Sequence, residues 1–388
     1  MKNSIFILIV LGIITFGCKQ EPVGQQPIDN IPSGPVTNVK IENTPGGAIL
    51  TFTMPPDEDL LYVKAVYSLK EGVMSEARSS LYKDTLRIVG FGDTAERQVK
   101  VIAVDRSRNE SPAVDITINP LTPSVTTIGE SMDLVADFGG VHGYWTNATR
   151  AEVSVVLLKE DNNKEYNSIE TFYSTMALGD GASRGMDTIP EKFGIYVQDR
   201  WENRSEIKYF TLTPLYETKF DRLKFRAVDL PNDESFVGGW PKSDMWNGVT
   251  GNNGYSSPGG TGRWPHSVTI DLGVTGKVSR LKLFQRTDPY TYSEGNLKKF
   301  EVYGCTTLDP TGNWASWTKL MDCTSIKPSG LPLLENSNED VARAVNGEDF
   351  INSPLNAKVR YIRIKVLRTW AGGDNFQISE LQIFGDNR

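Results

Sequence analysis

The sequence predicts an all-β protein made of two tandem β-sandwiches and one further two-sheet β domain. Apolar and polar residues alternate in short runs between turns rich in Gly (35 residues) and Pro (21 residues). No run has the period of a long amphipathic helix or of a coiled coil. The polar phrase Asp-Arg-x-x-Asn-x-Ser begins at Asp105 and again at Asp199, 94 residues later, which is about the length of one β-sandwich domain, ~100 residues.

The first 17 residues have the pattern of a lipoprotein signal peptide. One Lys precedes an apolar run from Ile5 to Ile14, and the segment ends in Gly17-Cys18. The run is shorter than the ~20 residues that a membrane span needs and has the length of a signal-peptide core. The Gly-Cys pair resembles a bacterial lipobox, which implies cleavage before Cys18 and lipidation of its thiol. The alternative is an ordinary signal peptide with an incidental cysteine.

Residues 18–34 are polar and rich in proline, so they predict a flexible tether. The formal net charge of −7 and the pI of about 5.2 argue against a nucleic-acid partner, which requires clustered Lys and Arg. The chain contains only two histidines, His142 and His266. Two histidines offer few ligands for a zinc site and few candidates for a Ser-His-Asp triad. The sequence therefore predicts a protein without catalytic residues.

Residues 35–121 predict the first sandwich. Its strands place alternate apolar residues on one face, as in "AILTFTM" and "RQVKVIAV"; these residues are Ala48, Leu50, Phe52, Met54, Val99, Val101 and Ala103. The polar phrase follows "RQVKVIAV" and fits a turn between paired strands, since Asp and Asn bond nearby backbone groups. It resembles the last hairpin of a fibronectin type III domain, with Arg108 where that family usually has Gly.

Residues 122–216 predict a second, immunoglobulin-like sandwich. It contains a strongly apolar strand from Val153 to Leu158 and the second copy of the polar phrase. Trp145 is expected in its core rather than at a ligand, because large aromatic residues dominate such cores. Both copies of the phrase are therefore interpreted as structural turns and not as binding sites.

Residues 217–388 carry six of the eight Trp and predict the third domain. The segments "VTIDL", "RLKLF", "KFEVYG", "YIRIKV" and "ELQIFG" alternate as strands. Their order, with Asp-Leu-Gly after the first, resembles a discoidin or coagulation-factor C-type domain. This galactose-binding-like jelly roll serves as a carbohydrate-binding module in many bacterial proteins.

That resemblance implies a sugar site built from three loops. It assigns ligand contacts to Arg286 after the "RLKLF" strand, Asn296 before "KFEVYG", and Trp370 before the last strand. An aromatic ring suits the apolar face of a sugar, while charged and amide groups bond its hydroxyls. Alternatively, Arg286 pins a carboxylate inside the fold. Further candidates for the rim of the site are Asp288, Tyr290, Tyr292, Trp264 and Trp240.

The same resemblance implies a structural Ca²⁺ ion where an early loop meets the last strand. Glu380 matches the strand position, and Asn247 stands where the family usually has Asp. Calcium binds six to eight oxygens, many of them backbone carbonyls, so one such change is compatible with a weaker site.

Cys305 and Cys323 flank a predicted hairpin, with Trp314 midway between them. If the flanking segments pair as strands, the two cysteines lie opposite each other or nearly so. The sequence leaves open a disulfide and two free buried thiols.

The whole arrangement resembles the surface glycan-binding lipoproteins of Gram-negative polysaccharide-utilisation systems. This implies a non-catalytic protein of the outer membrane that captures a polysaccharide at the cell surface, beside a transporter and glycosidases. Two alternatives remain: an adhesin or other protein-binding surface lipoprotein, and a glycoside hydrolase or its accessory subunit.

Overall fold

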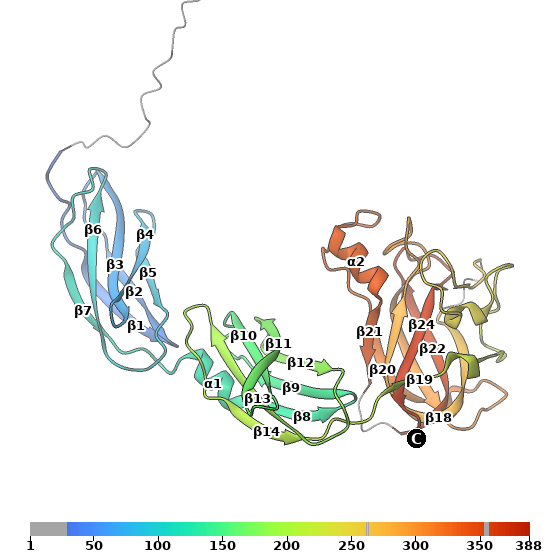
Figure 1. The fold of residues 1–388 in the computed structure, drawn as a ribbon. Coiled ribbons are helices and arrows are strands. Elements are labelled where there is room, and N and C mark those ends of the chain that lie inside the picture. Colours follow the sequence, from blue (N-terminus) through green and yellow to red (C-terminus); the bar gives the residue numbers. More distant parts are fainter. Residues whose placement is uncertain (1–28, 261, 263, 353–356) are drawn as a thin grey trace, which may run out of the picture. The chain divides into compact units, whose positions relative to one another are not determined.

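The computed structural model describes residues 29–260, 262, 264–352 and 357–388 (Figure 1). It is all-β, with two tandem sandwiches followed by a jelly roll, each with a hydrophobic core of its own. The signal peptide, Cys18 and most of the expected tether lie outside the described residues. Within the described part of the chain, no helix combines the length and the apolar character that crossing a membrane requires.

The first sandwich packs a three-stranded sheet against a four-stranded one. Ala48 and Leu50 are fully buried on one face of β2, and Val99 and Val101 are buried on β6, as the alternation predicts. The first sheet has the order β1 (Thr37–Thr44), β2 (Gly47–Thr53), β5 (Thr85–Val89). The second has the order β4 (Val73–Ser80), β3 (Leu60–Lys70), β6 (Arg97–Asp105), β7 (Val114–Ile118).

The second sandwich repeats this division after a short helix, α1 (Ser124–Ser131). Trp145 is buried, as predicted, with its ring centroid 6.0 Å from that of Phe172. One sheet has the order β12 (Leu178–Arg184), β9 (Gly140–Thr146), β8 (Asp133–Asp137). The other has the order β11 (Tyr166–Ser174), β10 (Val153–Glu160), β13 (Glu191–Asp199), β14 (Lys208–Leu212).

The repeated polar phrase forms the same turn in both sandwiches. The carboxylate of Asp105 accepts hydrogen bonds from the backbone N–H of Asn109 (2.8 Å) and from its Nδ2 (2.9 Å). Asp199 accepts the same two bonds from Asn203, at 3.0 and 2.8 Å. Arg108 has a φ of +66°, which explains why related turns use Gly there. The prediction that both copies of the phrase form a turn is confirmed.

The jelly roll is organised by one long strand, β18 (His266–Phe284), that belongs to both of its sheets. The sequence predicts two strands and a turn here, whereas the structure has a single bent strand. The pairing register shifts between Asp271 and Gly276, and Gly273, at a φ of +68°, allows the backbone to bend. The early half of β18 pairs with β16 (Arg226–Val228) and β22 (Val359–Thr369), and the late half with β21 (Glu348–Ile351) and β24 (Glu380–Asp386).

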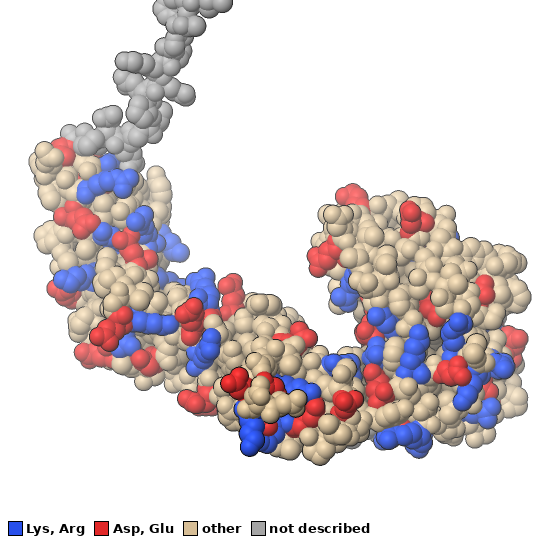
Figure 2. Space-filling model, viewed as in Figure 1, with Lys and Arg blue, Asp and Glu red and all other residues tan. Residues whose placement is uncertain are grey.

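The remaining strands complete the sheets and cover their ends. β22 pairs with β19 (Leu297–Cys305), which forms a hairpin with β20 (Thr318–Thr324). β15 (Thr218–Lys219) pairs with β24, and β17 (Tyr255–Ser256) pairs with β23 (Gln377–Ile378). A second helix, α2 (Asn338–Asn346), lies between β20 and β21 in the sequence. In the view of Figure 2, the half of this domain near α2 carries few Lys and Arg, which gather toward the opposite half.

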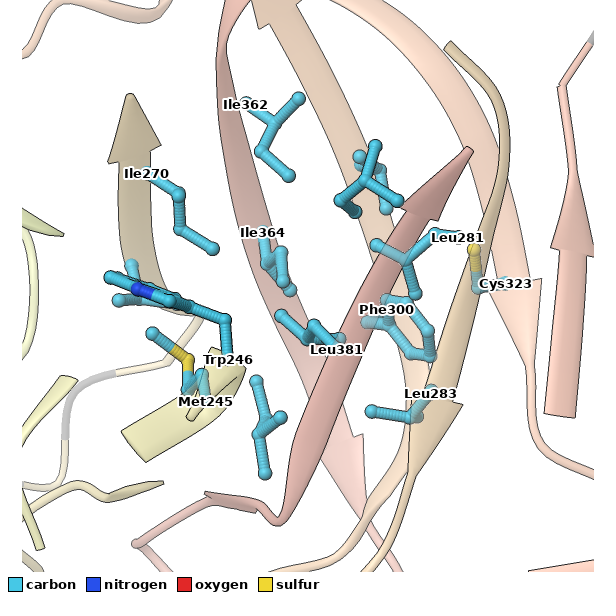
Figure 3. Packing of buried hydrophobic residues seen from close by; sticks show 14 of the residues in the cluster. Met245, Trp246, Ile270, Leu281, Leu283, Phe300, Cys323, Ile362, Ile364 and Leu381 are labelled. Atoms are coloured by element: carbon cyan, nitrogen blue, oxygen red, sulfur yellow. The ribbon is translucent and has the colours of Figure 1, made fainter. Parts of the chain in front are cut away.

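Inward-facing residues of both sheets form the core of the jelly roll (Figure 3). Ile270 on β18, Ile364 on β22 and Leu381 on β24 are 2% exposed or less. Trp246, from the 3₁₀ helix η2 (Lys242–Trp246), closes one side of this core. This packing holds the strand ends from which the candidate site residues project.

The two cysteines are buried and free. Cys323 lies opposite Phe300, whereas Cys305 is five residues further along the same strand and pairs with Tyr361. At ~3.3 Å per residue, this separates the two cysteines by ~16 Å, far beyond the reach of a disulfide. The prediction that they lie opposite each other is wrong, and the structure has the alternative of two free thiols.

Candidate functional site

Arg286 stands two residues beyond the end of β18 and is 9% exposed. Its Nε and Nη2 donate to Oδ1 of Asn252 (3.0 and 2.7 Å), and its Nη1 donates to Oε1 of Gln377 (2.6 Å). No carboxylate of the described residues forms an ion pair with Arg286. The alternative that Arg286 pins a carboxylate inside the fold is therefore wrong. The guanidinium is oriented by the neutral amides of Asn252 and Gln377.

Two aromatic rings flank this guanidinium. Its central carbon lies 4.7 Å from the ring centroid of Trp240 and 4.2 Å from that of Tyr290, and both rings are half-buried. Contacts of this kind contribute ~0.5–2 kcal/mol. Arginine has five N–H donors and three are engaged here, so two N–H groups remain. The cluster can therefore donate hydrogen bonds beside partly exposed apolar ring surface.

Asn296 has a supporting role, which corrects its predicted role as a ligand contact. Its side chain is 0% exposed. Its Oδ1 accepts the N–H of Arg286 at 2.8 Å, and its Nδ2 donates to the carbonyls of Arg286 (2.9 Å) and Tyr290 (2.8 Å). A fully buried amide with both ends engaged positions the neighbouring residues instead of meeting a ligand.

Tyr292 also departs from its predicted place on the rim. It is 0% exposed, and its hydroxyl donates to Oε1 of Glu348 at 3.2 Å. Burial, with the nearby Glu348 carboxylate, raises the pKa of this phenol. Of the other rim candidates, Asp288 is exposed in the loop after Arg286.

Trp264 is 40% exposed and stands over a buried histidine. Its ring meets that of His266 edge to face, with centroids 4.4 Å apart. His266 is 1% exposed, and its Nδ1 lies 2.9 Å from Oε1 of Glu234. The histidine therefore supports Trp264 from below, while the indole remains accessible.

Sequence reasoning missed Asn252 and Gln377, the two residues that orient Arg286. Asn252 belongs to "GNNGY", which follows the predicted metal ligand Asn247 in the sequence. Gln377 lies on β23, which pairs with β17. The amide-rich sequence of this loop could have indicated Asn252 as a site residue. No local sequence pattern indicates Gln377.

Trp370 lies in a different environment from Arg286. It lines a cavity of about 480 Å³ whose lining residues include Lys298 but not Arg286. The Lys298 ammonium is 4.1 Å from the centroid of the Trp370 ring, and the Tyr292 ring packs edge-on at 5.0 Å. The backbone N–H of Trp370 donates to the carbonyl of Asn296 (2.9 Å). The three residues predicted to form one site thus belong to two adjoining features joined by Asn296.

The residues around Asn247 and Glu380 do not fit a Ca²⁺ site. Glu380 is 1% exposed, its Oε2 accepts the N–H of Gly248 (3.0 Å), and burial raises its pKa to about 7. The guanidinium of Arg222 donates to the carbonyls of Trp246 (3.2 Å) and Asn247 (2.7 Å). Calcium needs six to eight oxygens, and here the Arg222 guanidinium already bonds two of the carbonyls beside a single buried carboxylate.

Three family models, each described as a domain of unknown function, match the chain. They are DUF4959 at residues 33–120, DUF5126 at residues 121–223 and DUF5000 at residues 243–385. A solved structure described as a SusE-like protein is 33% identical, and the match covers 69% of this chain and 100% of that chain, with a TM-score of 0.46. The chain belongs to the SusE-like family.

Other solved structures match single regions of this SusE-like chain at lower identity. A CBM32 module from a family 31 glycoside hydrolase of Clostridium perfringens is 17% identical, covering 43% of this chain and 95% of that one (TM-score 0.32). An F5/8 type C domain from Bacteroides fragilis is 11% identical, covering 44% and 98% (TM-score 0.31). A two-domain fibronectin type III segment of chicken tenascin is 13% identical, covering 46% and 99% (TM-score 0.23). A search of curated proteins found no match.

Proposed function

We propose that this SusE-like chain is a non-catalytic carbohydrate-binding lipoprotein that captures a polysaccharide through its C-terminal domain. The observation that carries the proposal is the environment of Arg286. Its guanidinium is nearly buried, has no carboxylate partner among the residues that the structure describes, and is oriented by two amides beside Trp240 and Tyr290. A sugar presents apolar C–H faces and hydroxyls that lose water on binding. The half-buried rings can pack against the C–H faces, and the two remaining N–H donors can bond the hydroxyls.

The proposal includes the place of the protein in the cell. Cys18, preceded by a short apolar core, is the proposed site of lipidation. The lipid would hold the chain in the outer membrane, exposed at the cell surface, where captured polysaccharide passes to neighbouring glycosidases and a transporter. Replacing Cys18 by Ala should move the protein from the membrane fraction to the soluble fraction.

Affinity electrophoresis through gels that contain single polysaccharides tests the binding role. The Arg286→Met variant keeps an apolar stem and loses all five donors. Arg360→Met is the matched control, because Arg360 pairs on the surface with Asp271 in the same domain. We expect at least one polysaccharide to retard the native chain and the control equally. Arg286→Met should lose about tenfold or more in affinity, since a hydrogen bond to a charged group is worth ~1.5–3 kcal/mol.

The same gels separate the alternatives. Release of sugar from the gel would identify an enzyme. Absence of both retardation and sugar release, across plant and host polysaccharides, would favour a protein-binding surface lipoprotein. Equal retardation of a folded Arg286→Met variant would show that the glycan is bound elsewhere on the chain.

A further inference from the structure

The cavity beside Trp370 has walls of a distinct composition. It measures about 480 Å³ and is lined by Lys298, Trp370 and residues 325–327 and 330–333. These lining residues include two lysines and no carboxylate. Three of them expose apolar side chains: Ile326 (61%), Leu331 (42%) and Leu333 (46%). The cavity thus combines positive charge with apolar surface.

Hydrogen bonds of two buried side chains, Lys327 and Asp340, hold one wall of this cavity in place. Lys327 is 7% exposed, and its ammonium donates to the carbonyls of Pro332 (2.9 Å) and Glu335. The fully buried carboxylate of Asp340, in the first turn of α2, accepts from the backbone N–H (2.9 Å) and the hydroxyl (2.6 Å) of Ser329. The wall is therefore preformed, and the Lys327 ammonium is used in its internal hydrogen bonds.

Lys298 is the cation that remains available. Its ammonium lies 4.1 Å from the centroid of the Trp370 ring and has no carboxylate partner among the described residues. Tyr292, which also contacts this ring, is fully buried and packs against it from the interior. Lys298 lines the cavity, so it covers the indole on the side that a ligand would approach.

We propose that this cavity binds an acidic sugar unit, a uronate, of a captured glycan. A neutral sugar that stacks on Trp370 must displace the Lys298 ammonium from the ring and gives it no new partner. A uronate also displaces it but supplies a carboxylate, so the ammonium exchanges a ring contact for an ion pair. The exposed apolar residues of the wall suit the C–H face of the same sugar. The inference rests on the proposed glycan-binding role and adds a second site with its own ligand class.

Isothermal calorimetry on the full chain tests this site with two matched ligands. One is trigalacturonate, and the other is the same trisaccharide after reduction of each carboxylate to the neutral galactose form. We expect the acid form to bind about tenfold more tightly at low salt, with an advantage that shrinks as salt screens the ion pair. Lys298→Met should remove the advantage and its salt dependence. Lys299→Met is the control, because this neighbouring lysine is exposed and does not line the cavity.

Several outcomes would overturn the inference: equal affinity for the two trisaccharides, no binding of either, or an acid preference that survives in Lys298→Met. The two experiments also distinguish a failure of this inference from a failure of the proposed function. If Arg286→Met abolishes retardation by a polysaccharide while neither trisaccharide binds, the proposed function stands and this inference fails. If Lys298→Met alone changes binding, the cavity stands and Arg286 is not the glycan contact.

Discussion

Asn296 bonds both backbone polar groups of Arg286, accepting its N–H at 2.8 Å and donating to its carbonyl at 2.9 Å. The same side chain donates to the carbonyl of Tyr290 at 2.8 Å. One buried amide therefore fixes the start of the loop that bears the guanidinium and the position of one of the rings beside it. The geometry of the proposed binding cluster therefore depends on a fully buried residue.

Replacing Asn296 by Ala should therefore weaken both the domain and its binding. The change removes the hydrogen bonds that Asn296 makes to the buried N–H and carbonyl of Arg286, which costs about 1–3 kcal/mol in the free energy of unfolding. Urea denaturation measures this cost, and affinity electrophoresis measures the loss of binding. Asn232→Ala, an exposed asparagine of the same domain, is the control and should change neither. Undiminished glycan affinity in a folded Asn296→Ala chain would contradict the positioning role.

Cys305 and Cys323 should behave as two inert thiols. Burial raises the pKa of Cys305 to about 11 and raises that of Cys323 as well, and only the thiolate attacks alkylating reagents. We expect neither to react with iodoacetamide at pH 8 in the folded chain and both to react in urea without prior reduction. The mass increase by mass spectrometry counts them. Alkylation that requires a reductant would reveal a disulfide.

The sequence predicted the strands and turns whose signals are local. Ala48 and Leu50 alternate with polar residues, and this period is what places them on the buried face of β2. The turn at Asp105 was equally visible, because its Asp and Asn bond each other within five residues. The all-β architecture follows from such local patterns.

Features that depend on distant partners were not predictable in this way. Pairing of β19 with β20 ends at Gly304 and Thr318. Cys305 directly follows Gly304, whereas Cys323 lies well inside β20, so counting residues outward from Trp314 could not place the two cysteines. Gln377 reaches Arg286 across 91 residues of sequence, and no local pattern indicates that contact. The sequence therefore predicted Arg286 as part of the candidate site, but some of the residues that surround it in the structure differ from the predicted ones.

Glu380 should make the stability of the domain depend on pH. Burial raises its folded-state pKa to about 7, although the N–H of Gly248 and the charges of Lys219 and Arg222 oppose the shift; the unfolded value is ~4.3. The folded state thus disfavours the carboxylate, so this contribution to the free energy of unfolding is intact below pH 4 and is lost as pH rises toward 7.

Glu380→Gln isolates this effect, because glutamine still accepts the Gly248 N–H and cannot ionise. We expect the variant to gain stability relative to the native chain as pH rises from 4 to 8, by up to ~3 kcal/mol. Urea denaturation of both chains at each pH measures the difference. A difference that stays constant across this range would contradict a raised pKa at Glu380.

Arg222, in the 3₁₀ helix η1 (Arg222–Lys224), should make calcium unnecessary for folding of the jelly roll. Its guanidinium bonds the carbonyls of Trp246 and Asn247, the kind of oxygens that a Ca²⁺ ion would use. We expect millimolar CaCl₂ and EDTA to leave the melting temperature unchanged, since a ligand stabilises only the state it binds. Arg222→Met should lower the free energy of unfolding by about 0.5–1.5 kcal/mol by removing these hydrogen bonds, whereas Lys224→Met, in the same 3₁₀ helix, should not. A melting temperature of the native chain that rises with calcium and falls with EDTA would show that the ion, and not Arg222, holds this loop.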